Sequence, residues 1–298
     1  MNLTIEILRS AISYATPVLL VALGGSFSFH ANVFNIAMEG MMLTSAFMSV
    51  ALSYVTGSWA LGIIGGIGGS LLITLIFSFF ILNLKVGEFI TGIALNLFTT
   101  GSTTYFLRQI FNVKGALINP QIQPIPKLDI PFIRSIPVLG TILNGHNLLV
   151  YISFFFIAPL VYITIYKTQI GLRMRATGQD SKVVDSVGIN SVPIKFRTLL
   201  YCGLLCGLGG SALSIGYMSL FTENMSAGRG WIALAIIILT QGNPITIMLL
   251  SLLFGFFEGV GLSLQNFGIP SQFSAMLPYI STLLALFLYS RRLRIRKA

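Results

Sequence analysis

The sequence predicts an all-α fold, a polytopic membrane helix bundle of about nine or ten transmembrane helices. Hydrophobic residues make up 55% of the chain and charged residues only 9%, and the mean hydropathy is +0.87. Apolar runs close to the roughly 20 residues that a spanning helix needs recur along the chain. We therefore expect a single transmembrane domain over residues 1–298 and no soluble core.

Nine apolar runs, separated by polar breaks, are the predicted spans. They cover residues 10–28, 33–56, 58–83, 88–108, 147–166, 197–219, 228–242, 244–266 and 272–290. The first run follows Glu6 and Arg9 and has no convincing cleavage site, so we expect an uncleaved first helix. Glycines four residues apart, such as Gly203 and Gly207, favour close helix packing in lipid.

The distribution of charge predicts the orientation. Residues 167–197 carry six basic and two acidic side chains, and the tail 291–298 carries five basic and no acidic ones. Cytoplasmic loops are enriched in Lys and Arg, so both segments are expected in the cytoplasm. Residues 109–146 then form an extracytoplasmic loop, which five prolines make irregular. Because the two basic segments hold +9 of the net charge of +10, no basic surface is left for nucleic acid.

The number of spans decides the side of the N-terminus. Nine crossings with a cytoplasmic C-terminus would leave the N-terminus outside, and ten would return it to the cytoplasm. The polar interval 32–39 can contain a short or broken tenth crossing, because interrupted helices occur at membrane depth where they line an enclosed cavity. We expect ten. Residues 23–26 recur as Leu-Gly-Gly-Ser at 208–211, which favours a parallel internal repeat.

Polar residues within the apolar runs are candidates for a substrate pathway. An ionised carboxylate in the middle of a membrane helix costs about 2.5 to 3.5 kcal/mol, so such residues usually face a protein interior or a watery path. The pathway candidates are Asn32, Asn35, Glu39 and Asn96. Glu223 and Arg229, near the predicted outer boundary, are candidate contacts for a binding protein or a gate. For each residue the alternative is a hydrogen bond that holds two helices together.

The basic loop contains a predicted short helix that begins at Asp180 or Ser181, either of which can cap it, and ends at Gly188. Three valines would share one of its sides, which is typical of a docking element. The candidate docking residues are Ala176, Gly178, Asp180, Val183, Val184, Val187 and Gly188. The alternative is a solvated loop whose charges only determine topology.

Catalytic and cofactor motifs are missing from the sequence. No Gly-Lys pair exists, so an ATP-hydrolysing loop is excluded and any ATPase must be a separate subunit. No nucleophile with a nearby base and no paired catalytic carboxylates occur, so we do not expect an enzyme. Residues 228–233 match a dinucleotide-binding pattern but open a membrane span instead of following a strand. His30 and His146 lack Cys or His neighbours at metal-ligand spacing, so neither a metal nor a cofactor is expected.

Four segments, in order over nearly the whole chain, resemble the membrane permeases of bacterial ABC importers for branched-chain amino acids, ribose and nucleosides. They are residues 35–40 (Asn-Ile-Ala-Met-Glu-Gly), 176–190, 207–210 (Gly-Leu-Gly-Gly) and 228–235 (Gly-Arg-Gly-Trp-Ile-Ala-Leu-Ala). The first and last are most similar to the nucleoside branch, which includes guanosine and purine nucleoside permeases. After Ala235 the chain lacks the bulky aromatic and basic stretch often found in the family, which leaves the substrate class open.

This resemblance implies a type II ABC importer-like fold in the bacterial plasma membrane. It implies three partners: a second homologous permease in a heterodimer, an ABC ATPase with two nucleotide-binding domains that binds ATP and Mg, and a lipid-anchored substrate-binding protein. Residues 178–187 would be the coupling helix. The chain would form half of a pathway for nucleosides, with a small neutral substrate. Alternatives are a sugar or branched-chain amino acid permease of the same family, a secondary transporter, or a membrane-embedded scaffold.

Overall fold

The computed structural model describes residues 3–131, 139–265, 276, 277 and 280. The predicted span 272–290 lies outside these residues except at its three described positions, and the basic tail 291–298 lies outside them entirely. The longer helices are α1 (Leu3–His30), α2 (Met38–Thr56), α3 (Trp59–Ser78), α4 (Glu88–Phe111), α8 (Ala158–Lys167), α9 (Gln169–Gln179), α11 (Ser191–Ser211), α12 (Arg229–Thr240) and α13 (Pro244–Gln265). Shorter helices are α6 (Leu139–Leu143), α7 (Leu148–Tyr151) and α10 (Ser181–Ser186).

Short π-helical segments continue three of these helices. They are η1 (Phe79–Asn83) after α3, η2 (Ile152–Ile157) between α7 and α8, and η3 (Ala212–Met218) after α11. Two two-residue strands, β1 (Ala116–Leu117) and β2 (Phe221–Thr222), pair antiparallel. The predicted all-α class is thereby confirmed.

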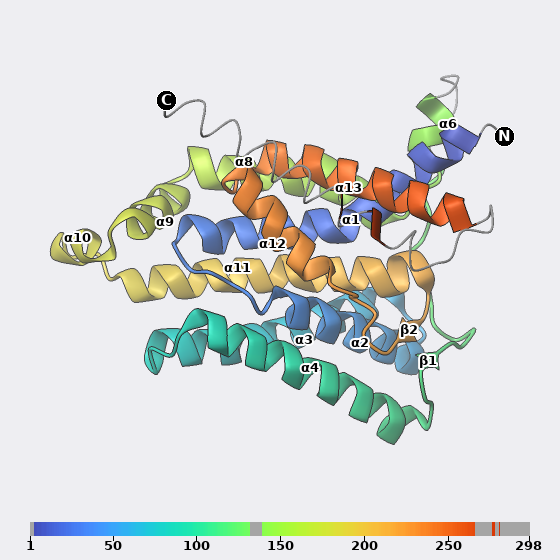
Figure 1. Ribbon diagram of the computed structural model, residues 1–298, viewed down its shortest axis with the longest axis horizontal. Helices are drawn as coiled ribbons and strands as arrows, with labels where there is room; N and C mark the ends of the chain where they lie inside the picture. Colours follow the sequence, from blue (N-terminus) through green and yellow to red (C-terminus); the bar gives the residue numbers. More distant parts are fainter. Residues whose placement is uncertain (1–2, 132–138, 266–275, 278–279, 281–298) are drawn as a thin grey trace.

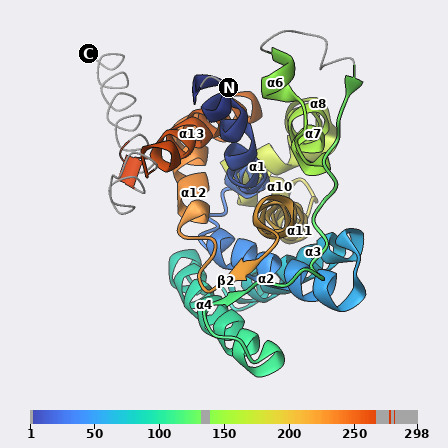
Figure 2. The ribbon, with the colours of Figure 1, turned by 90° about the vertical axis from the view of Figure 1, so that its right-hand side faces the viewer.

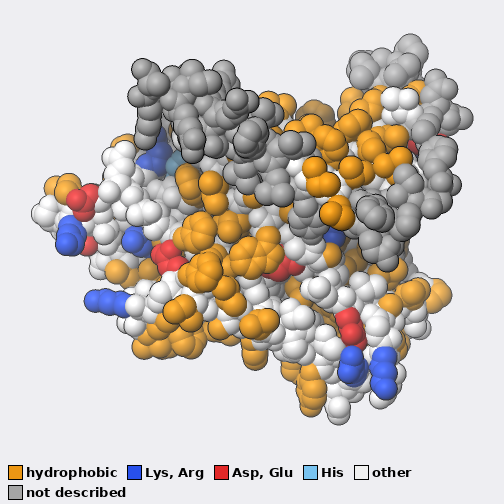
Figure 3. All heavy atoms as spheres, viewed as in Figure 1, with side chains coloured by type: hydrophobic (Ala, Val, Ile, Leu, Met, Phe, Trp, Pro, Cys, Tyr) orange, Lys and Arg blue, Asp and Glu red, His pale blue; other side chains and the backbone are white. Residues whose placement is uncertain are grey.

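The long helices lie along one axis, so the molecule has two distinct ends (Figure 1). We call them the α9–α10 end and the β1–β2 end. Viewed along this axis, α1 and α11 lie in the centre of the bundle, with α2, α3 and α4 on one side and α13 and α7–α8 on the other (Figure 2). Hydrophobic side chains cover much of the face between the two ends (Figure 3). The hydrophobic core of the protein lies around these two central helices.

Six helices among the described residues are long and apolar enough to cross a membrane. This number confirms the polytopic membrane class, although it is smaller than the number of predicted spans. The 24-residue α4 is not one of the six, although it extends from one end of the bundle to the other (Figure 1). The predicted span 228–242 is present as the continuous helix α12, which has 12 residues and is therefore shorter than a spanning helix needs.

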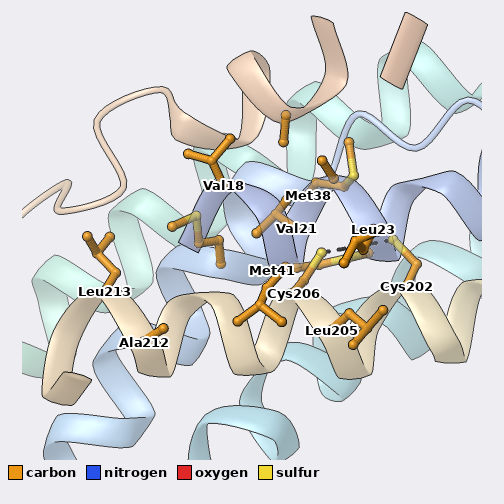
Figure 4. Packing of buried hydrophobic residues seen from close by; sticks show 14 of the residues in the cluster. Val18, Val21, Leu23, Met38, Met41, Cys202, Leu205, Cys206, Ala212 and Leu213 are labelled. Atoms are coloured by element: carbon orange, nitrogen blue, oxygen red, sulfur yellow. Dashed lines mark hydrogen bonds between the residues drawn. The ribbon is translucent and has the colours of Figure 1, made fainter. Parts of the chain in front are cut away.

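Glycine lets the central helices approach closely. A β-carbon added to Gly24 of α1 would lie 2.9 Å from the carbonyl oxygen of Cys202, and one added to Gly210 of α11 would lie 2.3 Å from that of Met42. Side chains of α1, α2 and α11 interlock in the space between (Figure 4). Cys202 and Cys206 are fully buried free thiols here and pack as small hydrophobic side chains.

The predicted tenth crossing at residues 32–39, and with it an N-terminus on the same side as residues 167–197, is wrong. The total number of crossings stays a prediction, because most of the span 272–290 lies outside the described residues. The first half of α1 lies at the β1–β2 end, where the Ser13 hydroxyl is 3.0 Å from Nδ1 of His146. Its last residue, His30, packs against Gly178 at the α9–α10 end. The N-terminal end of α1 is therefore opposite the segment 167–197. Residues 31–37 do not form a helix of their own; they turn back into the bundle, and together with α2 they make one interrupted crossing.

The parallel repeat is wrong as well, because α1 and α11 run in opposite directions. Gly24 faces Cys202, whereas Gly209, seven residues further along α11, faces Pro17, which lies earlier in α1. Each helix is followed by a non-helical segment that returns into the bundle and then by a further helix, α2 or α12 (Figure 1). The two Leu-Gly-Gly-Ser sequences thus belong to units of inverted orientation.

Candidate functional site

The two interrupted crossings meet about midway along the bundle, where the N-terminus of α2 faces that of α12 (Figure 1). Contact between them is direct, since a β-carbon on Gly230 would lie 2.6 Å from the Cα and backbone nitrogen of Glu39. The first backbone N–H groups of a helix have no partner within it, and its N-terminus carries partial positive charge. Two such ends facing each other require acceptors and negative charge.

Glu39 supplies both to α12. Its carboxylate accepts hydrogen bonds from the backbone N–H groups of Gly228, at 2.8 Å, and of Gly230, at 2.6 Å. The residue is only 8% exposed. Although Glu39 belongs to α2, its charge therefore stabilises the start of α12.

Asn96 and Asn35 do the same for α2 and the segment before it. The side chain of Asn96 accepts from the N–H of Gly40 at 2.8 Å and donates to the carbonyl of Ile36 at 3.0 Å. Asn35, which is buried, accepts from the N–H of Ala37 at 3.1 Å. Three of the four pathway candidates thus come together at the meeting point of α2 and α12.

Asn32 lies elsewhere. It is exposed in the turn that follows α1, and its φ of 53° places it in the left-handed region. The hydrogen bonds of Asn35, Glu39 and Asn96 fit the helix-holding alternative, and contact with substrate stays a prediction for all four residues. No group of three or more His, Cys, Asp or Glu side chains is placed to hold a metal ion in the part of the chain that the structure describes.

The side chain of Arg229 is largely, but not fully, covered. Its guanidinium forms an ion pair with Glu258 of α13, and the two side chains are 17% and 13% exposed. Beside this pair, the hydroxyl groups of Tyr14 and Tyr217 share a hydrogen bond. This cluster connects α1, η3, α12 and α13. Arg229 would contact a binding protein only through the 17% of its side chain that is exposed.

Glu223 does lie at the β1–β2 end. Its carboxylate is 3.0 Å from the guanidinium of Arg108 and 3.3 Å from the N–H of Gly115. The hydrogen bond from Arg108, followed by that from Gly115, lowers the pKa of Glu223 below its ordinary value. Glu223 thereby fastens the β1–β2 pair to the end of α4.

The predicted helix in the basic loop is present as α10. Asp180 caps it by accepting from the N–H groups of Lys182 and Val183, at 2.9 and 3.3 Å, and Gly188 follows it with φ of +83°. The prediction that Val183, Val184 and Val187 share one side is wrong. Val184 is buried at 7% exposure, whereas Val183 and Val187 are 59% and 70% exposed. Val187 lies beyond the last helical residue, so helical spacing does not set its direction.

Ala176 and Gly178 belong to α9, which reaches the end of α1. A β-carbon on Gly178 would lie 2.1 Å from the carbonyl oxygen of His30. The His30 ring is 3.2 Å, at Nε2, from the carbonyl oxygen of Gly242, just beyond α12, and it packs edge-on against Tyr166. His30 thus connects the loop region to the C-terminal end of α12.

His30, Tyr14 and Tyr217 are residues that sequence reasoning did not select. His30 carried a signal, because it is a polar side chain at the end of an apolar run and next to the polar interval 32–39. The two tyrosines carried none, since a tyrosine near a membrane boundary is ordinary.

Comparison with known proteins adds independent findings. The chain matches the family described as branched-chain amino acid transport system / permease component over residues 7–286. It is 32% identical over 295 residues to the nucleoside ABC transporter permease protein NupC of Lactococcus lactis subsp. cremoris (strain MG1363), covering 95% of this chain and 92% of the relative. No solved structure gives a significant match.

Two further relatives are similar over nearly their whole length. The guanosine ABC transporter permease protein NupQ of Bacillus subtilis (strain 168) is 31% identical over 291 residues, covering 94% of this chain and 90% of the relative. The putative glucose ABC transporter permease protein TsgC13 of Haloferax volcanii is 27% identical over 293 residues, covering 95% and 87%.

Proposed function

Because the chain belongs to the family of branched-chain amino acid transport permease components, we propose that it is a transmembrane subunit of an ATP-binding cassette importer and forms half of a nucleoside pathway. The observation that carries this proposal is the similarity, over more than nine tenths of the chain, to relatives named as nucleoside and guanosine permeases. Sugar or branched-chain amino acid transport is the alternative, and the glucose permease relative favours sugar.

The meeting point of α2 and α12 supports a transport role. Transporters commonly build their sites where broken helices meet near the middle of the membrane. Among the described residues here, polar groups are mainly amides and one carboxylate, and the cation Arg229 is already paired with Glu258. This chemistry suits a neutral, hydrogen-bonding ring compound and disfavours a phosphorylated one.

Uptake measurements test the substrate. Cells lacking this chain are given labelled nucleosides, glucose, ribose and leucine, with and without complementation by the wild-type chain. We expect nucleoside uptake to fall and to return on complementation. A loss of glucose, ribose or leucine uptake with nucleoside uptake intact would overturn the nucleoside assignment and leave the importer assignment standing.

The α9–α10 end is the proposed docking surface for the ATPase, which binds ATP and Mg in a separate subunit. It carries exposed apolar side chains next to basic ones, which is typical of a binding surface. The exposed apolar side chains are Ile170, Leu172, Val183, Val187 and Ile189. We place this end and the C-terminus in the cytoplasm, and the β1–β2 end, where a lipid-anchored binding protein would dock, outside.

We also propose that the two permease subunits form a heterodimer. One chain supplies one α9–α10 segment, and an ATPase with two nucleotide-binding domains offers two places to dock, so a second, homologous permease supplies the other. Movement of α9 would reach α12 through Gly178 and His30, because these contacts are direct.

Substitution of Val183 and Val187 by Asp tests the docking surface. Both side chains are exposed, so the variant should still fold. Uptake, and the coupling of ATP hydrolysis to transport, should fall severely. Val55→Asp is the matched control. Val55 is also exposed, at 74%, but it lies at the C-terminal end of α2, away from the α9–α10 end. Normal uptake by the double variant at normal expression would remove the docking assignment.

A further inference from the structure

A polar cleft opens at the β1–β2 end, beside the first half of α1. Its volume is about 460 Å³, and its lining includes Glu6, Arg9, Lys127 and His146. The Arg9 guanidinium lies directly over the backbone of Gly145, where a β-carbon would be 2.6 Å from Nη2. Neither Arg9 nor Lys127 forms an ion pair with any residue that the structure describes. The cleft thus presents two unpaired cations and one carboxylate.

An apolar groove of about 380 Å³ adjoins this cleft. It is lined by Ile12, Val150, Phe154, Phe155, Met248 and Leu252, and His146 lines both cavities. The ring of His146 is held in place, with Nδ1 3.0 Å from the Ser13 hydroxyl and Nε2 2.7 Å from the carbonyl oxygen of Ile142. A fixed side chain therefore marks the boundary between a charged compartment and a hydrophobic one.

The groove lies on the flank of spanning helices, and its lining comes mainly from α1, α7, η2 and α13. Phe155 in its wall is 64% exposed, so its ring faces the surroundings of the bundle. Around membrane-spanning helices those surroundings are lipid chains. A ligand that fills both compartments needs an anionic head and a hydrocarbon tail.

We propose that the cleft and the groove together bind one anionic phospholipid of the leaflet at the β1–β2 end. Its phosphate lies between Arg9 and Lys127, and one acyl chain lies against Phe154 and Leu252. Among the described residues that line the cleft, the exposed Glu6 beside the two cations leaves a net charge of +1, which matches a headgroup with one negative charge. This site is separate from the meeting point of α2 and α12, so it does not depend on the substrate.

A soluble anion would use only half of this arrangement. Inorganic phosphate fits the two cations and leaves the groove unexplained, and an acidic loop of a partner protein would do the same. Only an amphiphile occupies both the charged cleft and the apolar groove that share His146 in their lining.

Native mass spectrometry of the delipidated complex, titrated with palmitoyl-oleoyl phosphatidylglycerol or the phosphatidylcholine of the same chains, tests the proposal. We expect preferential retention of one phosphatidylglycerol. Arg9→Gln with Lys127→Gln should weaken that retention about 25-fold, since each cation near a lipid surface contributes about fivefold. Lys114→Gln, an exposed cation at the same end, should leave it unchanged.

A second pair of variants tests the groove with the charges intact. Leu252→Trp fills it and should release the lipid, whereas Leu249→Trp, on an exposed face of the same helix, should not. Equal retention of both lipids by the wild type, or unchanged retention by the double cation variant, would overturn the proposal. Full competition by inorganic phosphate would identify a soluble anion site instead. If the double cation variant retains the lipid as the wild type does but binds the substrate-binding protein less tightly, the two cations belong to a protein contact instead.

Discussion

Glu39 shows how one side chain can hold two helices at a break. A carboxylate within a membrane span is costly unless its environment supplies donors, and here the donors are two backbone N–H groups of α12. Those N–H groups would otherwise lack partners, because they open a helix. The charge and the helix end therefore satisfy each other.

Glu39→Gln is expected to lower stability and uptake. A glutamine has one acceptor oxygen and no charge, so one of the two hydrogen bonds is lost and the other is weakened. Hydrogen bonds to charged groups contribute about 1.5 to 3 kcal/mol, and we expect a loss of that order in the free energy of unfolding. Thermal melting of the purified protein and hydrogen exchange at Gly228 and Gly230 measure it. Unchanged protection of both amides would contradict this role.

Gly178 is the residue at which α9 touches α1. A methyl group there would lie 2.1 Å from the carbonyl oxygen of His30, so Gly178→Ala must push α9 away from the end of α1. Overpacking of this kind costs about 1 to 3 kcal/mol. We expect membrane insertion to persist and uptake to fall. Gly101→Ala, in α4, is the control, because no atom lies within 4 Å of the position that its β-carbon would take. Equal uptake by the two variants would show that the contact between Gly178 and His30 does not transmit movement.

At the level of elements, the β1–β2 pair depends on Glu223. Its lowered pKa means that the ion pair with Arg108 persists as the pH falls through the ordinary Glu range and is lost only below it. Stability from this contact is therefore present at neutral pH and disappears in acid. The N–H of Glu223, which donates to Gly115 at 2.9 Å, reports the change.

Hydrogen exchange at the Glu223 amide, measured against pH, should show protection that ends below the ordinary Glu pKa. Arg108→Gln should move the end of protection to higher pH, because it removes the largest cause of the lowered pKa. The same midpoint in both proteins would show that Arg108 does not determine it.

The whole molecule places the start of α1 and the β1–β2 pair at one end, and α10 at the other (Figure 1). Cysteines introduced at Thr4 and Lys114 should therefore react with an impermeant reagent from the same side of the membrane, and one at Lys182 from the opposite side. The native Cys202 and Cys206 are fully buried, so background labelling should be low. If Thr4→Cys and Lys182→Cys are both labelled from the same side, the chain crosses the membrane an even number of times between these two positions, which would contradict the arrangement described here.

The sequence by itself determined the membrane class, most of the helical spans, the cap of α10 and the polar interval that proved to be a break. Each of these depends on neighbours in the chain: a long apolar run, or an Asp before a short helix, is readable locally. The motifs that carry the family resemblance are also local. Residues 35–40 and 228–235 were selected separately, with no indication that they touch.

Only the tertiary structure decided what those residues do to one another. Glu39 and Gly230 are 191 residues apart in the sequence, which offers no sign that one caps the helix of the other. The extra crossing at residues 32–39 was wrongly predicted for the same reason, since hydropathy cannot distinguish an extra crossing from a segment that turns back to complete one. Such a segment is stable only where other helices supply its hydrogen bonds, as Asn96 of α4 does, and packing between distant helices is a property of the folded chain alone.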